Sequence, residues 1–339
     1  MRPRLEISFD RDLRRAFRRQ KPIYQARDNE FVLNHARGGL LLALQSLQLP
    51  QGSKVGVMVY NCHTVMNAVA QAGCEVVFVD INDEMRMDLD DLQRKSDSMK
   101  ALVVTHLFGI VNDVEAIRRR CPQLIIIEDC AHAFGKHVEG DFGVFSIGQG
   151  KLPSLGDGGM LLVNNREYLE AVRSLYDTLP SYSKWGEAGL FVKLLLRSWM
   201  YGRWTYGLFT IRWKQMRKQR SGKETIVLKR MSLGVQAMLY LRKDALKGEI
   251  ERRIERAKKE SEKLSRNPLA IKSMYGENAF MLVVVSTNPA LLKGQYAREG
   301  IETATHFSNS IVWAKEFGYQ GDCPTAEKMV ETLLMVPVY

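Results

Sequence analysis

One stretch of the 339-residue sequence places several reactive side chains close together. An apolar run at 124–127 is followed directly by Glu128 and Asp129, and a second run at 144–147 is followed by Lys151 in the glycine-rich segment GQGKLPSLGDGG. Such short runs are typical of buried strands in a parallel sheet. Lys151 is a candidate Schiff-base amine, because partial burial lowers the pKa of a lysine and frees its nitrogen as a nucleophile. Glu128 is expected to point to the other face of its strand and to be structural.

The elements that must position these residues alternate between strands and helices. Strands are predicted at 54–60, 75–80, 101–106, 124–129 and 144–147, with helices at 64–72 and 113–120, the latter capped by Asn112. This alternation predicts an α/β fold with a mostly parallel sheet flanked by helices. Open sheets of this kind bind ligands at the carboxyl ends of their strands, where Asp129 is expected.

Another helix is predicted to begin near Arg37, Gly38 and Gly39. Two glycines at a helix entrance let the backbone approach a ligand closely, and the exposed N–H groups there favour an anion such as a phosphate. An ordinary turn before a helix is the alternative interpretation.

The pattern changes after a strand at 160–165 and a helix at 166–175. A long helix is predicted at 232–264, then a strand at 279–286 and a helix at 289–299, which together indicate a smaller α+β domain. We expect a basic N-terminal arm (1–27) with a helix at 10–19, a large domain (28–185), a basic tryptophan-rich insertion (186–228), and a long helix with the small C-terminal domain (229–339).

The formal net charge of +11 is concentrated in two segments. Residues 189–230 hold eleven basic residues and one acid, and residues 1–27 hold nine basic residues and three acids. The five cysteines show no CxxC spacing, which favours a reducing cytoplasm over a disulfide framework and gives no sign of a metal site. No signal peptide or membrane-spanning run is recognisable.

The insertion interleaves Trp199, Trp204 and Trp213 with arginines and lysines. It could pack on a partner subunit near the mouth of the site, or residues 189–220 could lie on an anionic membrane surface. Basic residues with interleaved aromatics also suit single-stranded nucleic acid, which is the least favoured interpretation.

The motifs together resemble the DegT/StrS-type sugar aminotransferases, which are pyridoxal 5'-phosphate (PLP) enzymes of fold type I. The resemblance runs from HARGGLLLAL through IEDCAHAFG and FSIGQGKLPSLGDGGML to RMSLGVQAM and MVPVY. Asp129, His132, Ser146 and Lys151 stand in the order and local spacing of that family.

This resemblance implies a role for each residue. Lys151 would bind PLP as a Schiff base and move protons during transamination, while Asp129 would pair with the pyridinium nitrogen. His132 would lie beside the cofactor ring. Ser146 would bind the phosphate together with the backbone of Gly38 and Gly39, and Arg37 could add charge there.

Three departures from the family pattern concern the rest of the site. Cys62 stands where many relatives have an aromatic residue that stacks on the cofactor ring, and Tyr60 or His63 could substitute for it. The family asparagine that reaches the neighbouring subunit aligns with Leu228, which leaves Lys229 or Arg230 as replacements. The usual helix after the MVPVY-like motif is absent, so the chain is truncated or differently finished.

The implied activity is amino transfer, commonly from glutamate, to a keto group of a nucleotide-linked sugar, in a cytoplasmic homodimer with possible peripheral contact to the inner face of the membrane. Relatives that dehydrate sugars replace the lysine with histidine, so Lys151 favours transamination. The alternatives are a PLP sugar dehydratase of the same fold and a noncatalytic membrane-surface or regulatory binder.

Overall fold

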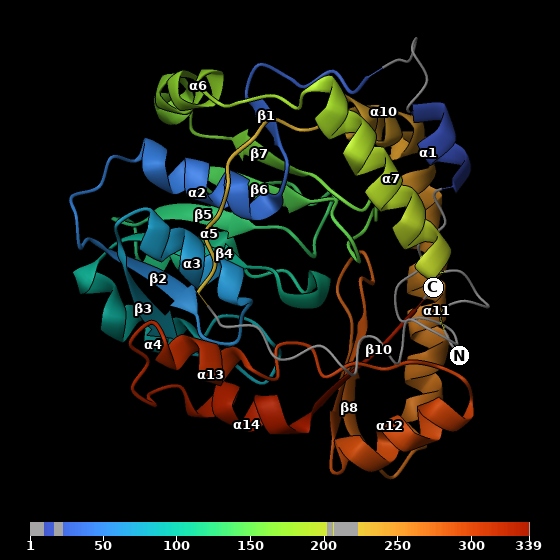
Figure 1. The fold of residues 1–339 in the computed structure, drawn as a ribbon. Coiled ribbons are helices and arrows are strands. Elements are labelled where there is room, and N and C mark those ends of the chain that lie inside the picture. Colours follow the sequence, from blue (N-terminus) through green and yellow to red (C-terminus); the bar gives the residue numbers. More distant parts are fainter. Residues whose placement is uncertain (1–9, 17–22, 202–205, 207–222, 339) are drawn as a thin grey trace.

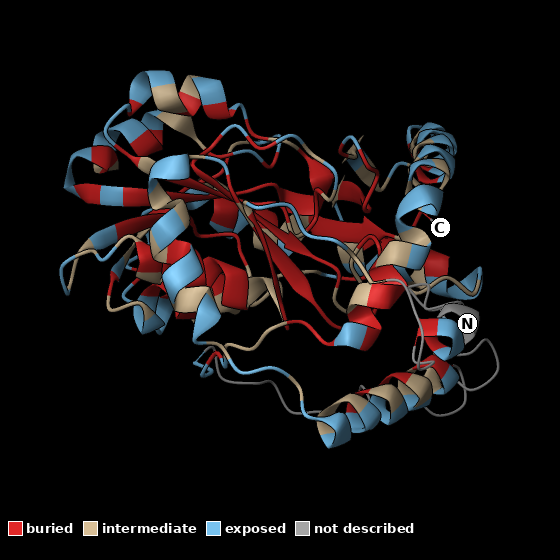
Figure 2. Cartoon of the chain, turned by 90° about the horizontal axis from the view of Figure 1, so that it is seen from above, coloured by how far each residue is buried: buried red, intermediate tan, exposed pale blue. Residues whose placement is uncertain are grey.

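The computed structural model describes residues 10–16, 23–201, 206 and 223–338. Within these residues the chain forms a seven-stranded sheet and a three-stranded sheet (Figure 1). Helices surround the larger sheet, and their outward sides are exposed while the strands are almost entirely buried (Figure 2). Parts of the predicted N-terminal arm and of the predicted insertion lie outside the described residues.

The larger sheet has the order β1-β7-β6-β5-β4-β2-β3. Its strands are β1 (Glu30–Leu33), β2 (Lys54–Met58), β3 (Glu75–Val79), β4 (Met99–Thr105), β5 (Ile125–Asp129), β6 (Phe142–Ser146) and β7 (Gly159–Val163). Neighbours from β3 to β6 run parallel, whereas β7 and β1 add two antiparallel pairs at one edge. The predicted mostly parallel α/β sheet is confirmed.

Both faces of this sheet are buried under helices. Successive side chains of a strand point to opposite faces, so each strand contributes to two cores. Ala101 and Val103 of β4 pack on one face, and Leu102 and Val104 pack on the other. The first face is covered by α2 (Ala36–Ser46), α3 (His63–Gln71) and α6 (Leu169–Asp177), and the second by α4 (Leu89–Lys95) and α5 (Val114–Arg120). Asp113 caps α5 by accepting from the Ala116 amide, so the predicted Asn112 cap is wrong.

The smaller sheet has the order β10-β9-β8 and is antiparallel. Its strands are β8 (Ala270–Met274), β9 (Leu282–Ser286) and β10 (Leu333–Val336), and its other elements are α11 (Leu246–Leu264), α12 (Pro289–Arg298), α13 (Ser310–Lys315) and α14 (Pro324–Thr332). Val283 and Met335 of this sheet belong to the same buried cluster as Met58 and Leu102 of the larger one. The two sheets therefore share a core.

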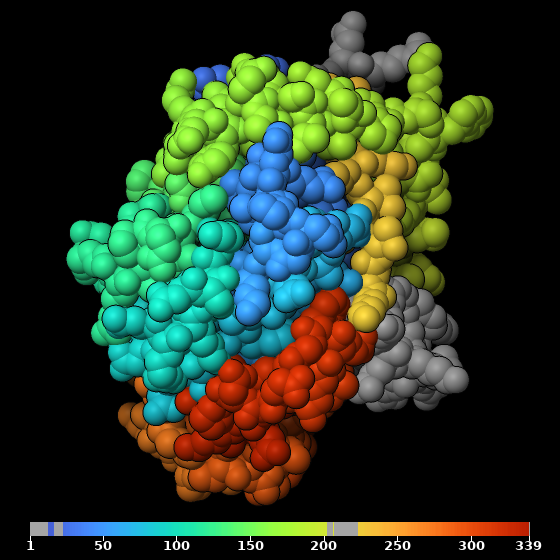
Figure 3. Space-filling view, turned by 90° about the vertical axis from the view of Figure 1, so that its left-hand side faces the viewer, coloured from blue at the N-terminus to red at the C-terminus, as the bar shows by residue number. Residues whose placement is uncertain are grey.

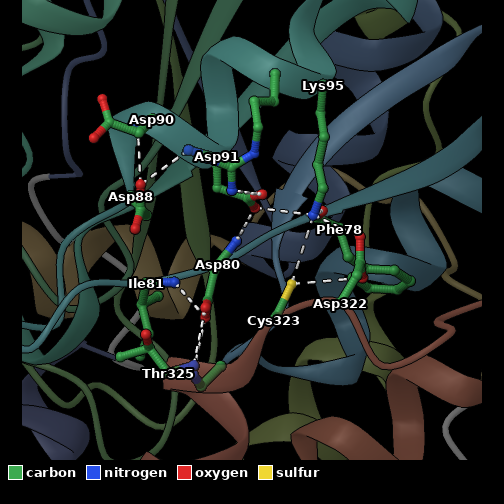
Figure 4. A network of polar contacts seen from close by, with 12 residues as sticks. Phe78, Asp80, Ile81, Asp88, Asp90, Asp91, Lys95, Asp322, Cys323 and Thr325 are labelled. Atoms are coloured by element: carbon green, nitrogen blue, oxygen red, sulfur yellow. Dashed lines mark hydrogen bonds and ion pairs between the residues drawn. The ribbon is translucent and has the colours of Figure 1, made fainter.

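A buried carboxylate joins the C-terminal part to the larger sheet (Figure 4). Asp80, which follows β3, accepts hydrogen bonds from the backbone amides of Thr325 and Ala326 in the first turn of α14, both at 2.9 Å. A negative charge at a helix N-terminus is favourable. The backbone amide of Asp80 in turn donates to Asp91 of α4.

A third helical layer packs at the end of the molecule near β1 and β7. It contains α1 (Asp10–Ala16), α7 (Lys184–Met200) and α10 (Leu233–Arg242). Leu13 and Ala16 of α1 are fully buried, so this part of the predicted arm packs against the rest of the chain. The prediction of one continuous helix at 232–264 is wrong, because a short 3₁₀ turn at Lys243–Ala245 separates α10 from α11.

Residues 223–230 run as an extended segment across the outer side of α3 towards β1 (the yellow band in Figure 3). Gln71 of α3 exchanges two hydrogen bonds with the backbone of Ile226, and Asn34 bonds the backbone of Val227. This segment brings Glu224 to the N-terminus of α3. Among the described residues, no helix is both long and apolar enough to cross a membrane.

Candidate active site

A cavity of about 350 Å³ lies at the carboxyl ends of β4, β5 and β6, bordered by the N-termini of α2 and α3. This is the size range of small-molecule sites. Six of the predicted site residues line it, namely Arg37, Cys62, Asp129, His132, Ser146 and Lys151. They come from three separate parts of the chain, around Arg37, Cys62 and the segment 129–151, which the larger sheet brings together.

Lys151 lies in the loop between β6 and β7, at the cavity wall. Burial lowers the pKa of its amine, and the negative charges of Cys62 and Asp129 only partly oppose this effect. The Nζ atom lies 5.8 Å from the centroid of the Phe280 ring. A lowered pKa increases the fraction of neutral amine, which is the nucleophilic form of lysine.

Asp129 ends β5 with its carboxylate oriented by neighbours. One oxygen accepts from the Ala131 amide at 3.0 Å, and the other lies 3.5 Å from Thr105 Oγ1, which also accepts from Asn61 Nδ2 at 2.8 Å. Burial raises the pKa of Asp129, although the Ala131 amide and Lys151 act against that rise. A cationic ligand group beside this carboxylate would stabilise its ionised form and offset the effect of burial on its pKa.

His132 is sandwiched between aromatic rings, with Phe280 at 4.3 Å and Phe307 at 5.8 Å between ring centroids. Its Nδ1 accepts from the Phe108 amide at 3.1 Å, so the proton of the neutral ring is on Nε2. Burial, followed by Lys151 and His306, lowers the pKa of His132 well below its usual value. The buried Nε2–H has no partner among the described residues, so its hydrogen bond is left for an acceptor on a ligand.

The part of the cavity at the start of α2 suits an anion. His35, Ala36 and Arg37 line it at the start of α2, where no side chain caps the helix and no acidic residue lies in the first turn. Ser146 adds a hydroxyl from the end of β6. Helix N-termini of this kind favour phosphate groups.

Gly38 and Gly39 lie in the same first turn but are not among the residues that line the cavity. Their amides donate to the carbonyl of His35. A Cβ at Gly39 would lie 3.5 Å from both Leu161 and Val144. A Cβ at Gly38 would lie 3.2 Å from Leu228, so the closest contact of this turn is with the segment 223–230. The residues of this turn that line the cavity are Ala36 and Arg37.

Tyr60 and Arg230 are also placed away from the cavity lining, so neither faces a ligand there. Tyr60 is buried and its hydroxyl donates to the His306 carbonyl at 2.6 Å. Arg230 donates to Asp177 and lies over the ring of Tyr176 at 4.9 Å. Within one chain, both residues have structural roles.

The sequence analysis did not single out two cationic residues of α7 that contribute to the cavity. Lys193 and Arg197, one helical turn apart, line the cavity, and Arg197 also donates to the Gly156 carbonyl at 3.2 Å. The available signal was their spacing of four residues within an apolar helix, which places both on one side. They add positive charge to the side of the cavity that α7 borders.

The donor set fits PLP. The amine of Lys151 suits its aldehyde, the buried carboxylate of Asp129 suits its pyridinium nitrogen, and the unpartnered Nε2–H of His132 suits an oxygen. Ser146 and the entrance of α2 suit its phosphate.

Comparisons with known proteins agree with this geometry. Residues 15–193 match the model of the DegT/DnrJ/EryC1/StrS aminotransferase family. A GDP-perosamine synthase of Vibrio cholerae is 32% identical over 137 residues, which is 37% of each chain. A UDP-N-acetyl-3-dehydro-alpha-D-glucosamine 3-aminotransferase of Acidithiobacillus ferrooxidans is 32% identical over 148 residues, which is 40% of each. The chain thus spans about two fifths of the length of these relatives.

A putative sugar aminotransferase of Streptococcus pneumoniae in its apo form has a similar structure. The TM-score is 0.73 at 16% identity, and the match covers 99% of this chain and 91% of the other. At this identity the likeness establishes the shared fold.

Proposed function

Since the chain belongs to the DegT/DnrJ/EryC1/StrS aminotransferase family, we propose that it is a PLP-dependent aminotransferase acting on a keto group of a nucleotide-linked sugar. The observation that carries this proposal is the convergence of the Lys151 amine, the Asp129 carboxylate and the free Nε2–H of His132 on one cavity. The names of curated relatives, a GDP-perosamine synthase and a UDP-N-acetyl-3-dehydro-alpha-D-glucosamine 3-aminotransferase, support the substrate class.

When bound, PLP supplies an electron sink for carbon–nitrogen chemistry. Lys151 would hold the cofactor covalently and afterwards carry protons with its freed amine, whose lowered pKa suits a general base. Asp129 would keep the pyridine nitrogen protonated, and His132 Nε2–H would orient the ring through its oxygen. Ser146 and the start of α2 would bind the phosphate.

The substrates follow from the charge of the cavity. Lys193 and Arg197 are suited to the diphosphate of a sugar nucleotide, because cations compensate its charge. We expect glutamate as the amino donor. We also expect a homodimer, in which a second chain would complete the mouth of the cavity.

Absorbance tests the assignment. The protein purified with PLP should show the visible band of lysine-bound cofactor, and glutamate should bleach it. The band should vanish in Lys151→Ala and persist in the control Lys193→Ala. Both lysines line the cavity, but it is Lys151 whose charge interacts with Asp129. A normal band in Lys151→Ala would remove the assignment, and a band that glutamate leaves unchanged would favour a noncatalytic binder.

Peripheral membrane contact at the inner face of the cytoplasmic membrane is part of the same proposal. Trp185, Val192 and Leu196 lie on one side of α7 and are 88%, 52% and 56% exposed. The surrounding sequence 189–230 is strongly basic, which suits anionic lipids. Salt-sensitive co-sedimentation with anionic liposomes, weakened by Leu196→Ser, would support this contact. No binding at low salt would exclude it.

A further inference from the structure

Cys62 differs from the other cysteines of the chain in its surroundings. It immediately precedes α3 as the N-cap residue and lines the cavity. It is partly exposed, whereas Cys74, Cys121, Cys130 and Cys323 are buried. Only Cys62 therefore combines access from the cavity with a position at a helix N-terminus.

Two side chains contact the sulfur. Thr64 Oγ1 donates to Cys62 Sγ at 3.2 Å, and His63 Nδ1 lies 3.9 Å away. The first turn of α3 holds no acidic residue. Hydrogen-bond donors and the positive end of a helix stabilise a thiolate over a thiol.

His63 is itself held by a second group. Its Nε2 lies 3.6 Å from Glu224 Oε2, and the same carboxylate oxygen accepts from Arg37 at 3.2 Å. The ring also packs against Trp313, with 4.9 Å between centroids. Cys62, His63 and Glu224 thus form a row in which the carboxylate orients the imidazole and the imidazole faces the sulfur. Activated nucleophiles in enzymes have this arrangement of nucleophile, base and orienting group.

The charges around Cys62 act in the same direction. Burial alone would raise the pKa of Cys62, but the hydrogen bond and charge of His63 and the bonds from Thr64 outweigh it and lower the pKa. The hydrogen bond with Cys62, and then Glu224, raise the pKa of His63. Lys151 interacts electrostatically with Cys62 from the loop after β6.

A separate feature of the same cavity points to a ligand. The Nε2–H of His132, on a side chain that is only 3% exposed, has no partner among the described residues. His132 and Cys62 both line this cavity, so a molecule with a hydrogen-bond acceptor that occupies it lies against both residues.

We propose that Cys62 is a nucleophilic thiolate, activated by His63 and Glu224, and the site at which small uncharged electrophiles with a hydrogen-bond acceptor modify this protein. In the reaction with iodoacetamide, the sulfur forms a bond to the methylene carbon and iodide leaves, with no oxidant required. The adduct remains in the cavity that Lys151 lines, so it competes with any ligand there. The inference does not depend on the identity of the proposed cofactor.

The test is alkylation of the intact protein by limiting iodoacetamide between pH 5 and 9, followed by mass spectrometry of each cysteine. An ordinary thiol is only a few per cent thiolate at pH 7, so Cys62 should react about tenfold faster than free cysteine there. His63→Gln and Glu224→Gln should each slow the reaction and move its pH midpoint upward. Cys62→Ser should remove the fast site, and Cys74→Ser is the matched control that should leave it.

An alkylation rate of Cys62 no faster than that of free cysteine would overturn the proposal. So would an unchanged pH midpoint in both His63→Gln and Glu224→Gln, provided that these variants unfold at the same temperature as the wild type. Addition of PLP separates this proposal from the proposed function. Fast labelling that PLP does not slow would leave the thiolate site intact while counting against a cofactor in this cavity.

Discussion

Replacing Asp80 by alanine tests whether the C-terminal part of the chain is held on the larger sheet by one carboxylate. Asp80 is 4% exposed and accepts from three backbone amides, those of Ile81, Thr325 and Ala326, at 2.8 to 2.9 Å. Two of these amides begin α14. Alanine would leave all three without their acceptor in a site that water enters poorly.

The magnitude follows from the hydrogen bonds and the burial. A hydrogen bond to a charged group contributes roughly 1.5–3 kcal/mol, and bonds to one carboxylate are not additive, so we expect a loss of about 3 kcal/mol. At about 2 °C per kcal/mol for a large domain, the melting temperature should fall by about 6 °C. Asp88→Ala is the matched control, because Asp88 accepts from the amides of Asp90 and Asp91 at 2.9 Å but is only half-buried. Loss of that cap should cost about 1 kcal/mol.

Thermal unfolding of both variants measures the difference, and hydrogen exchange locates it. In Asp80→Ala, amides of residues 310–336 should exchange faster than in the wild type, while those of β4 and β5 should change little. Asp88→Ala should affect only α4. Equal losses of stability in the two variants, or unchanged exchange in α14, would refute the assigned role of Asp80.

Three further predictions concern the site and its support. Asp129→Asn should weaken PLP binding roughly 10- to 100-fold, the value of one charge-assisted hydrogen bond, in a fluorescence titration. Lys193→Ala should raise KM for a sugar nucleotide about tenfold and reduce its salt dependence, with little change in kcat. Burial alone would raise the pKa of Glu128, but bonds from His106, Lys136 and the Gly140 amide lower it to about 2. The stability that comes from this lowered pKa is complete above the pKa of the unfolded state, about 4.3, and disappears as the pH falls towards 2. Glu128→Gln should therefore flatten the acid unfolding curve over this range. A curve identical to that of the wild type would contradict this prediction.

The strands that build the site could be predicted because they are continuous apolar runs followed by polar residues. Lys151 and Asp129 stood out for the same reason, and both line the cavity. Strands β1, β8 and β10 were missed, because β1 has only four residues, β8 is partly exposed without clear alternation and β10 adjoins α14 without a turn. The assignment of β1 depends on pairing with β7, and that of β8 and β10 on pairing with β9, which local sequence does not encode.

The sequence also did not predict which residues the side chains would contact. The two glycines of α2 were correctly placed at a helix entrance, but the neighbours of Gly38 (Leu228) and of Gly39 (Val144 and Leu161) are set by the tertiary structure. Glu224 could not be connected with His63, because the segment that carries it returns from a distant part of the chain. Contacts of this kind require the tertiary structure.

The position of Phe307 in the cavity wall has a consequence for biosynthesis. Phe307 follows β9 and α12 in the chain, yet it lies beside His132 and lines the same cavity as residues of α2. A nascent chain on the ribosome could form β1 to β7 early, but its cavity would stay open on this side until more than three hundred residues had been synthesised. Cofactor capture should therefore follow release of the C-terminal part from the ribosome, and stalled chains that end before Phe307 should retain PLP poorly.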